Sequence, residues 1–417
     1  MNKETMPTHL GNRDLMRAIN RSAVLNTIKT YGPIARAEVA RRIGLSPATV
    51  TGITADLIEG DLIFEKETGD SSGGRRPILL ALNPSGGFVV GVKLTEQQAI
   101  GALTDLEATV IAKQADDLSG RDAIQVVETL SNLVTELVSL AGLPRSKLLG
   151  VGVGLAGIVD SGRGLLRQSP FFGWRDLPLR DLLQQKVNVP VYVDNDVNTL
   201  TLAEKWFGAG QGVDNFLTIT VGRGVGMGIV VNGQFYRGAR GGAGEFGHTV
   251  ISPDGPGCDC GKKGCLEVFV GDQGLLRQAE EGFRKGAIPR PVGSIDELIA
   301  LAEQGSPAAR EIFSRAGAIL GQAVANLINI FNPQRIIIGG EGVREGEWLF
   351  APMHTALACY AMPGLLEDTE IRIEPWGDDA WARGAASLVL RELFESPVNR
   401  EAAAIPAKAR LTLISDG

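Results

Sequence analysis

Three cysteines and one histidine lie close enough in the sequence to bind one metal ion. Cys258, Cys260 and Cys265 fall within eight residues, and His248 precedes Cys258 by ten residues. Thiolates combined with an imidazole are a typical tetrahedral zinc ligand set, and the glycines among them allow the loop to wrap tightly. Four protein ligands leave no open coordination position, so the spacing predicts a structural Zn²⁺ rather than a hydrolytic one. The alternative is three buried thiols and a surface histidine.

Carboxylates and an amide accompany this loop. The segment Asp194-Asn195-Asp196 follows an apolar run, at the predicted end of a strand, where open α/β sheets bind their ligands. A carboxylate there could accept the proton of an attacking sugar hydroxyl, as phosphoryl transfer requires, although capping of the next helix explains the same residues. Glu245 and Glu267 flank the metal loop, which would draw both into one cleft. Such a set suits the hydroxyls of a carbohydrate.

A run of alternating glycines allows two interpretations. These residues are Gly222, Gly224, Gly226 and Gly228. Closely spaced glycines let a backbone approach the phosphates of a nucleotide, but a tight hairpin explains the run equally well. The sequence alone leaves both open.

Hydrophobic periodicity predicts the elements that position these residues. Beyond residue 85, strands are predicted at 88–94, 99–104, 109–114, 148–155, 189–193, 216–221, 226–231, 335–338 and 371–374. Helices are predicted at 123–140, 197–207, 308–331 and 380–393. Two runs of antiparallel strands, each followed by strand–helix units, predict two similar α/β lobes with a cleft between them.

The N-terminal region differs from the rest in charge and in pattern. Residues 13–50 contain seven basic and two acidic residues, a net charge of +5, whereas the whole chain has a net charge of −7. A basic segment on an acidic chain indicates nucleic-acid binding by that part alone, or simply a solvated helix face. Helices are predicted at 14–31, 35–43 and 47–59, followed by a hairpin of 62–67 and 77–82. This order is typical of a winged helix-turn-helix.

The third of these helices is the one expected to enter the DNA major groove. It begins with the cap signal Ser46-Pro47, and its exposed face carries small residues that cannot form bidentate pairs with bases. We therefore expect Arg75-Arg76, at the hairpin tip, to read the narrow minor groove of an A/T-rich operator. Because such proteins usually read palindromes, two half-sites and a homodimer or tetramer are expected. The residues predicted to contact DNA are Arg36, Ser46, Ala48, Thr49, Thr51, Arg75 and Arg76.

Composition sets the remaining limits. The 417 residues are 44% hydrophobic and 21% charged, which excludes a disordered chain. No apolar run reaches the roughly 18–20 residues that span a bilayer, and the first residues lack the apolar core of a secretory signal. We therefore expect a cytoplasmic protein without membrane insertion. Residues 83–87, Asn-Pro-Ser-Gly-Gly, mark a boundary, which predicts domains at 1–84 and 85–395 and a C-terminal tail at 396–417.

Taken together, these segments resemble the ROK family of bacterial repressors and sugar kinases. The resemblance is carried by Asn195-Asp196, 244–248 (GEFGH), 258–267 (CDCGKKGCLE), 337–340 (IIGG) and 377–380 (GDDA). Near the N-terminus, 12–15 (NRDL) and 45–51 (LSPATVT) resemble the repressor branch. The resemblance implies an actin/hexokinase-like fold, with zinc bound by His248, Cys258, Cys260 and Cys265. It places at the sugar the residues Asn195, Asp196, Glu245, His248 and Glu267.

One departure from the family pattern favours the repressor branch. The kinases carry an Asp-x-Gly-Gly-Thr phosphate motif, whereas the matching stretch here has Lys93 in the aspartate position and Thr95 and Glu96 in place of the glycines. Side chains there block the approach of phosphate to the backbone, and Glu96 repels a triphosphate. We therefore expect no enzyme activity, a vestigial base at Asp196, and a regulator that senses a sugar or sugar phosphate. The alternatives are a ROK sugar kinase with an added DNA-binding domain and a repressor controlled by a protein partner.

Overall fold

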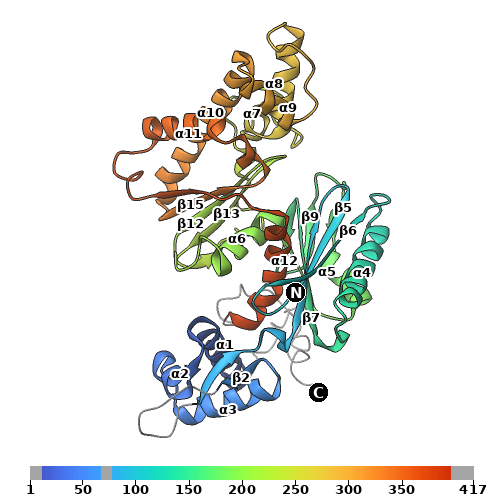
Figure 1. Ribbon diagram of the computed structural model, residues 1–417, viewed down its shortest axis with the longest axis vertical. Coiled ribbons are helices and arrows are strands. Elements are labelled where there is room, and N and C mark those ends of the chain that lie inside the picture. The colour runs from blue at the N-terminus through green and yellow to red at the C-terminus, as the bar shows by residue number, and fades with distance from the viewer. Residues whose placement is uncertain (1–11, 67–77, 396–417) are drawn as a thin grey trace, which may run out of the picture.

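The computed structural model describes residues 12–66 and 78–395, which form an N-terminal unit and two α/β lobes (Figure 1). The predicted hairpin tip with Arg75 and Arg76 and the predicted tail 396–417 lie outside the described residues. Within the described ranges, no helix is long and apolar enough to cross a membrane.

The N-terminal unit contains the three predicted helices and a small sheet. Its elements are α1 (Asn12–Tyr31), β1 (Ile34–Ala35), α2 (Arg36–Ile43), α3 (Pro47–Glu59), β2 (Ile63–Lys66) and β3 (Leu79–Leu82), and the strand order is β1-β3-β2. The predicted cap of α3 is confirmed, because the Thr49 N–H donates to Ser46 Oγ at 3.1 Å. Gly44 supplies the left-handed turn before it, with a φ of 70°. Sequence reasoning missed β1, which has only two residues and no periodicity.

The first lobe is a mixed five-stranded sheet covered by helices. Its sheet has the order β11-β7-β4-β5-β6, with β4, β7 and β11 parallel and β4, β5 and β6 antiparallel. The strands are β4 (Phe88–Leu94), β5 (Gln98–Thr104), β6 (Val110–Asp117), β7 (Leu148–Leu155) and β11 (Val191–Asn195). Helices α4 (Ala123–Leu140) and α5 (Leu179–Val187) accompany them. A second, three-stranded sheet of β8 (Ile158–Asp160), β9 (Leu165–Gln168) and β10 (Arg175–Leu177) was not predicted.

The second lobe repeats this topology, as predicted. Its sheet has the order β14-β13-β12-β15-β16, again three antiparallel strands continued by parallel ones. The strands are β12 (Phe216–Val221), β13 (Val225–Val231), β14 (Gln234–Phe235), β15 (Arg335–Gly339) and β16 (Glu370–Ile373). The helices are α7 (Glu267–Val270), α8 (Asp272–Arg284), α9 (Ile295–Glu303), α10 (Pro307–Phe331) and α11 (Glu347–Tyr360).

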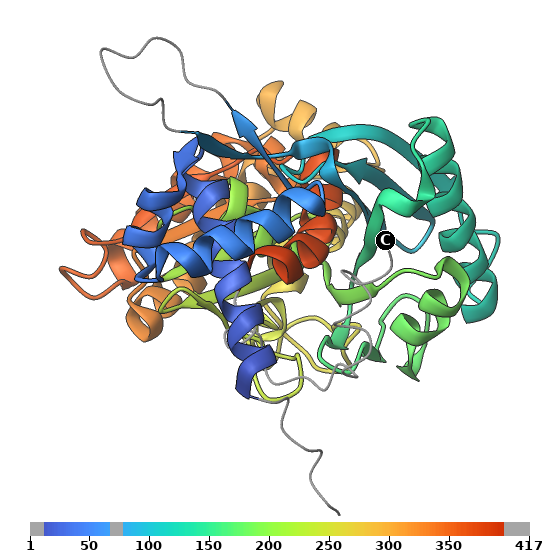
Figure 2. The same ribbon diagram turned by 90° about the horizontal axis from the view of Figure 1, so that it is seen from below.

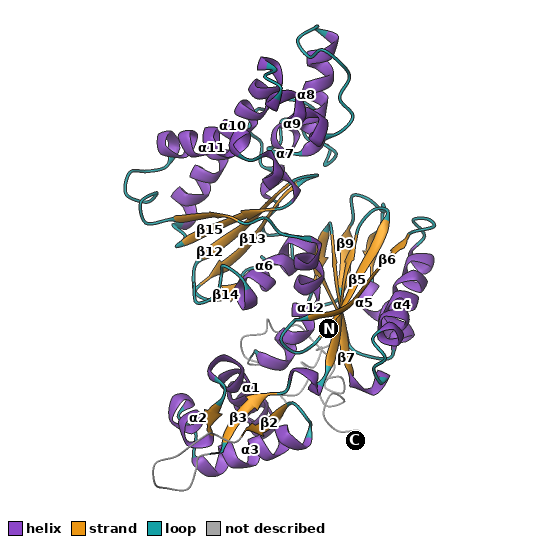
Figure 3. Cartoon of the chain, in the orientation of Figure 1, coloured by secondary structure: helices purple, strands orange, loops and turns teal. Residues whose placement is uncertain are grey.

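Two helices lie between the lobes, α6 (Asp196–Phe207) and α12 (Asp378–Phe394) (Figure 3). Helix α6 is buried without interruption from Val197 to Glu204. The glycine run makes room for it, since a Cβ on Gly228 would lie 2.0 Å from Thr201 Oγ1. The run is therefore the tight β12–β13 hairpin, packed against a helix. Glycines of the other sheet do the same for α12, because a Cβ on Gly152 would lie 1.8 Å from the Ala385 carbonyl oxygen.

The N-terminal unit is joined firmly to the first lobe. Its buried residues, such as Ile28 of α1, form one apolar cluster with Phe394 and Leu390 of α12. The connecting segment is fixed by Asp61, whose carbonyl oxygen and Oδ1 both accept from Asn83 Nδ2 at 2.8 Å. Lys147 of the lobe donates to Asp61 Oδ2 at 3.0 Å and to the Ser85 carbonyl at 3.2 Å. The boundary predicted after residue 84 therefore falls in a segment held by hydrogen bonds from both sides.

Candidate functional site

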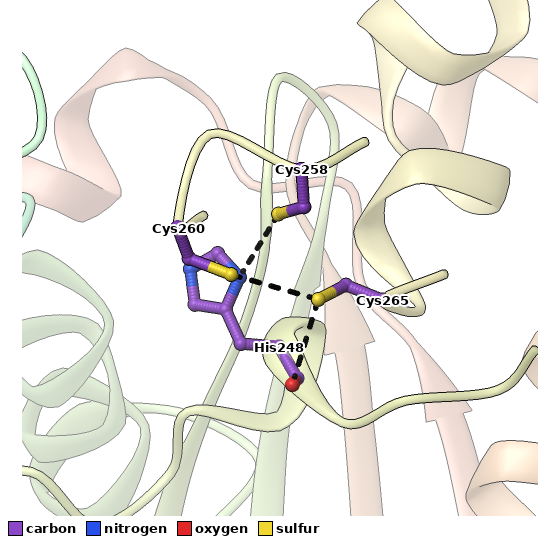
Figure 4. Close-up of side chains that lie close together, drawn as sticks. All are labelled: His248, Cys258, Cys260 and Cys265. Atoms are coloured by element: carbon purple, nitrogen blue, oxygen red, sulfur yellow. Dashed lines mark hydrogen bonds between the residues drawn. The ribbon is translucent and has the colours of Figure 1, made fainter. Parts of the chain in front are cut away.

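The four predicted metal ligands come together in the second lobe (Figure 4). One ligand atom from each of His248, Cys258, Cys260 and Cys265 lies within 4.8 Å of all the others. His248 closes the short 3₁₀ turn Phe246–His248, and the cysteines lie on the following loop. Gly264 shapes that loop, because it has a φ of 66° and a Cβ there would lie 1.5 Å from the Ser252 carbonyl oxygen. The loop geometry therefore holds three sulfurs and one imidazole around one point.

The surroundings act differently on the three thiols. At Cys260 the effect of burial is outweighed by hydrogen bonds from the Lys262 N–H and the neighbouring thiols, which lower its pKa. Burial and the two neighbouring thiols raise the pKa of Cys265 to about 12, and burial also raises the pKa of Cys258. Crowded thiols become metal-binding thiolates only when a positive charge offsets their mutual repulsion. Three sulfurs and one imidazole are also the donor set that a tetrahedral dication accepts. The residues present therefore fit a metal ion.

The His248 ring connects the cysteine cluster to the predicted pocket. Its Nδ1 lies 3.5 Å from Cys258 Sγ, and its Nε2 lies 3.9 Å from Glu245 Oε2. A ligating histidine typically directs its second ring N–H at a carboxylate, which fixes the orientation of both groups. The cluster therefore lies beside Glu245, although 3.9 Å is longer than a hydrogen bond.

The predicted pocket carboxylates also converge. The pKa of Glu245 is raised, first of all by burial and then by the charges of Glu267 and Asp196. The His248 ring opposes this rise. Glu267 begins α7 under the β12–β13 turn, where its Oε2 accepts from the Val225 N–H at 3.0 Å. Gly224 leaves that space free, since a Cβ on it would lie 2.8 Å from the same carboxylate oxygen.

Asn195 and Asp196 approach this group from the first lobe. Asn195 caps α6, because its Oδ1 accepts from the N–H groups of Val197 at 2.9 Å and Asn198 at 3.2 Å. The capping interpretation is thus confirmed. Asn195 also places Asp196 at the first position of α6. Burial raises the pKa of Asp196, and the nearby Lys93 ammonium opposes that shift. A role for these five residues in sugar binding stays a prediction.

A buried ion pair, which sequence reasoning missed, joins the two lobes beside the residues predicted to bind sugar. Arg237, from the second lobe, donates through Nε to Asp194 Oδ2 at 2.7 Å, and both side chains are almost fully buried. Asp194 Oδ1 also accepts from Asn198 Nδ2 at 2.9 Å and from the Asn195 N–H at 2.8 Å. Asp194 is therefore a positioning residue for its two neighbours. No local signal reveals it, since its partner lies 43 residues away.

The stretch that differs from the kinase phosphate motif is occupied by ion pairs between the lobes. Lys93 Nζ lies 3.8 Å from Glu341 Oε1 and 3.8 Å from the ring centroid of Trp381. Glu96 accepts from Arg121 of its own lobe and from Arg223 of the other. Charged side chains of this chain therefore link the two lobes at this stretch.

The described residues predicted to contact DNA lie around α3. Ser46, Ala48, Thr49 and Thr51 are exposed. Arg36 is partly buried, and its guanidinium donates to Thr54 Oγ1 at 3.0 Å and to Glu65 Oε1 at 2.7 Å within the unit. Contact of these residues with DNA stays a prediction.

Comparisons with known proteins agree with this geometry. The sequence profile of the ROK family matches residues 89–392. The chain belongs to the ROK family. It is 32% identical to the xylose repressor of Caldicellulosiruptor bescii over 93% of its own length and 99% of that protein. It is 31% identical to the DNA-binding transcriptional dual regulator NagC of Escherichia coli, over 92% of this chain and 95% of NagC.

Two solved structures place the ROK lobes on the actin/hexokinase-like fold. A ROK transcriptional regulator, a homologue of the Escherichia coli Mlc protein, superposes with a TM-score of 0.83 at 30% identity, covering 91% of this chain and 97% of that one. A ROK glucokinase from Streptomyces griseus, in complex with glucose and AMPPNP, superposes with a TM-score of 0.62 at 29% identity. The glucokinase match covers 72% of this chain but 99% of the enzyme.

Proposed function

We propose that this ROK protein is a sugar-responsive transcriptional repressor. Its N-terminal unit is a winged helix-turn-helix that binds operator DNA through α3 and the hairpin tip. A sugar or sugar phosphate binds between the lobes, at Asn195, Asp196, Glu245, His248 and Glu267. Binding of the sugar shifts the population between arrangements that bind DNA well and poorly. Two units in a symmetric dimer or tetramer read two A/T-rich half-sites.

One observation carries this proposal: the repressors match the chain including its N-terminal unit, whereas the kinase match covers much less of it. The repressors are similar to nearly the whole chain, 92–93% of it, and the structure of a ROK regulator covers 91%. The glucokinase is itself covered almost completely, yet accounts for only 72% of this chain. What this chain has beyond a ROK kinase is therefore a unit of about the size of the N-terminal one. Residues 13–50 of that unit have a net charge of +5, and the unit has the helix order of a DNA-binding motif.

The stretch from Lys93 to Glu96 supports a protein that is not a kinase. A triphosphate needs close backbone approach and a metal or cation to offset its charge. Here Lys93 is engaged with Glu341, and Glu96 is paired with Arg121 and Arg223, so the charged side chains of this stretch already have partners within the chain. On this proposal Asp196 serves as a sugar-binding carboxylate and not as a catalytic base.

We assign a structural Zn²⁺ to His248, Cys258, Cys260 and Cys265. With four protein ligands the ion would have no open position, so it would stabilise the loop instead of taking part in a reaction. Its influence on the sugar would pass through His248 and Glu245, which lie 3.9 Å apart.

The test combines ligand binding, DNA binding and a kinase assay on the full chain. Thermal shift against xylose, N-acetylglucosamine and their phosphates should identify a stabilising sugar, because a ligand at 100 times its Kd adds about 2.7 kcal/mol. That sugar should change the affinity for an operator fragment selected from random DNA. Asp196→Ala and Glu245→Ala should weaken sugar binding about 5- to 150-fold and leave operator affinity without sugar unchanged. ATP-dependent phosphorylation of the sugar would overturn the proposal in favour of the kinase, and an operator response only to an added protein would favour a protein regulator.

A further inference from the structure

A single lysine of the N-terminal unit is enclosed by aromatic rings of the ROK lobes. The Nζ atom of Lys29, on α1, lies 3.9 Å from the ring centroid of Trp206, 4.7 Å from that of Phe207 and 4.6 Å from that of Phe394. Trp206 and Phe207 end α6, and Phe394 ends α12. Figure 2 shows α1 beside the end of α12. An ammonium attracted by three ring faces is a specific contact between the unit and the body.

This contact is desolvated, which makes it sensitive to position. Burial lowers the pKa of Lys29 to about 7, and the charge of Glu107 opposes that shift, so the ammonium form that the rings attract predominates only below about pH 7. Cation–π attraction increases when water is excluded and weakens as the ammonium leaves the ring face. A small displacement of the rings therefore changes the stability of the docked unit.

The two helices that carry these rings begin at the predicted sugar pocket. Helix α6 starts at Asp196 and ends at Phe207, so it spans roughly 17 Å from pocket to rings at 1.5 Å per residue. The first turns of α12 carry Trp381, which lies 3.8 Å from the Lys93 ammonium that acts on Asp196.

The two helices are also packed against each other on the way. A Cβ on Gly384 of α12 would lie 2.8 Å from the Thr199 carbonyl oxygen of α6, so their backbones nearly touch. Closely packed helices of this kind shift together more readily than they deform.

We propose that the Lys29 aromatic cage is the contact through which occupancy of the sugar pocket reaches the DNA-binding unit. A sugar that binds Asn195 and Asp196 repositions the first turn of α6, and α6 with α12 carries that shift to the rings around Lys29. The two states differ in whether α1 is seated on these rings, which changes the orientation of α3. This inference rests on the proposed function.

The experiment measures coupling, defined as the ratio of operator Kd with and without the sugar that the thermal-shift panel identifies. Lys29→Met keeps the length and apolar stem of the side chain but removes its charge, and it should bring the ratio to within about twofold of 1, while the sugar Kd measured without DNA stays within about threefold. Lys29→Arg, which keeps a cation on the rings, should retain most of the coupling. Phe394→Leu should reduce it from the other side of the cage.

Lys186→Met is the matched control, because Lys186 lies on α5 of the first lobe and pairs with Glu128 at the surface. It should leave the ratio at the wild-type value. A Lys29→Met protein that binds operator and keeps the full wild-type ratio would overturn the inference while leaving the proposed function intact. A wild-type protein whose operator Kd does not respond to any sugar of the panel would overturn both. If Lys29→Met fails to fold, the comparison of Lys29→Arg with Phe394→Leu decides, since equal wild-type coupling in both excludes the cage.

Discussion

The carboxyl group of Glu345 should make the stability of this protein depend on pH in a direction that can be calculated. Glu345 ends the 3₁₀ turn Glu341–Glu345 and is only 1% exposed, and neither of its oxygens has a hydrogen-bond partner among the described residues. Burial, reinforced by the charge of Asp272 and opposed by Arg344, raises its pKa to about 8. The folded protein therefore holds this proton across a pH range in which the unfolded chain has released it.

The sign and size of the effect follow from that difference. Between the unfolded pKa of 4.5 and the folded value of about 8, folding requires uptake of a proton, so stability falls as pH rises by up to about 1.4 kcal/mol per pH unit. Over the whole range the loss in the free energy of unfolding amounts to about 3–5 kcal/mol. This loss is absent below pH 4.5 and complete above pH 8. Glu345→Gln, which cannot ionise, should remove this slope.

The assay is urea unfolding of both proteins at pH 5, 6.5 and 8.5, with the free energies of unfolding compared at each pH. The free energy of unfolding of the variant, relative to that of the wild type, should increase by about 3–5 kcal/mol between pH 5 and pH 8.5. Glu347→Gln is the control, because Glu347 is exposed two residues away and its loss should leave the slope unchanged. A constant difference between Glu345→Gln and wild type across this range would refute the reasoning.

Three further predictions address the pocket, the metal and the DNA. Asp194→Asn should lower the free energy of unfolding in urea by about 3–5 kcal/mol and weaken sugar binding, because it breaks the buried ion pair with Arg237. A variant as stable as the wild type would contradict this. Elemental analysis should find about one zinc per wild-type chain, which Cys260→Ser should lose together with a lower Tm, whereas Cys359→Ser should keep both zinc and Tm at wild-type values. Arg76→Ala should reduce the preference for A/T-rich over G/C-rich flanks more than Thr49→Ala does in competition binding at fixed salt, and equal weakening on both flanks would show that the hairpin tip only contacts phosphate.

The elements that sequence reasoning identified are those with a long periodic pattern. The helix at 123–140 and the strand at 148–155 have the predicted limits, because their apolar residues repeat over many turns or form one buried run. The strands β8, β9 and β10 were missed, since they have three or four residues each and depend on pairing with one another.

The candidate site divides in the same way. Its metal ligands were predictable because chemistry concentrates them in eighteen residues, from His248 to Cys265. The pairing of Asp194 with Arg237 was not, because each is a common charged residue until the two lobes bring them together. The ring contacts of Lys29 were equally hidden, since they join α1 to residues more than 170 positions later in the chain.

The segment that joins the N-terminal unit to the first lobe determines which spacing of DNA half-sites the proposed assembly can bind. In the arrangement with α1 seated on the rings around Lys29, Asn83 and Lys147 both bind Asp61, so the unit is held as a fixed arm and not on a flexible tether. A flexible tether would tolerate half-sites at many separations, because each unit could find its own groove. Two fixed arms in a symmetric assembly instead set one distance and one angular phase along the duplex, about a whole number of helical turns of roughly 10.5 base pairs. Inserting about five base pairs between the half-sites would turn one of them to the opposite face of the DNA, where the second arm cannot follow.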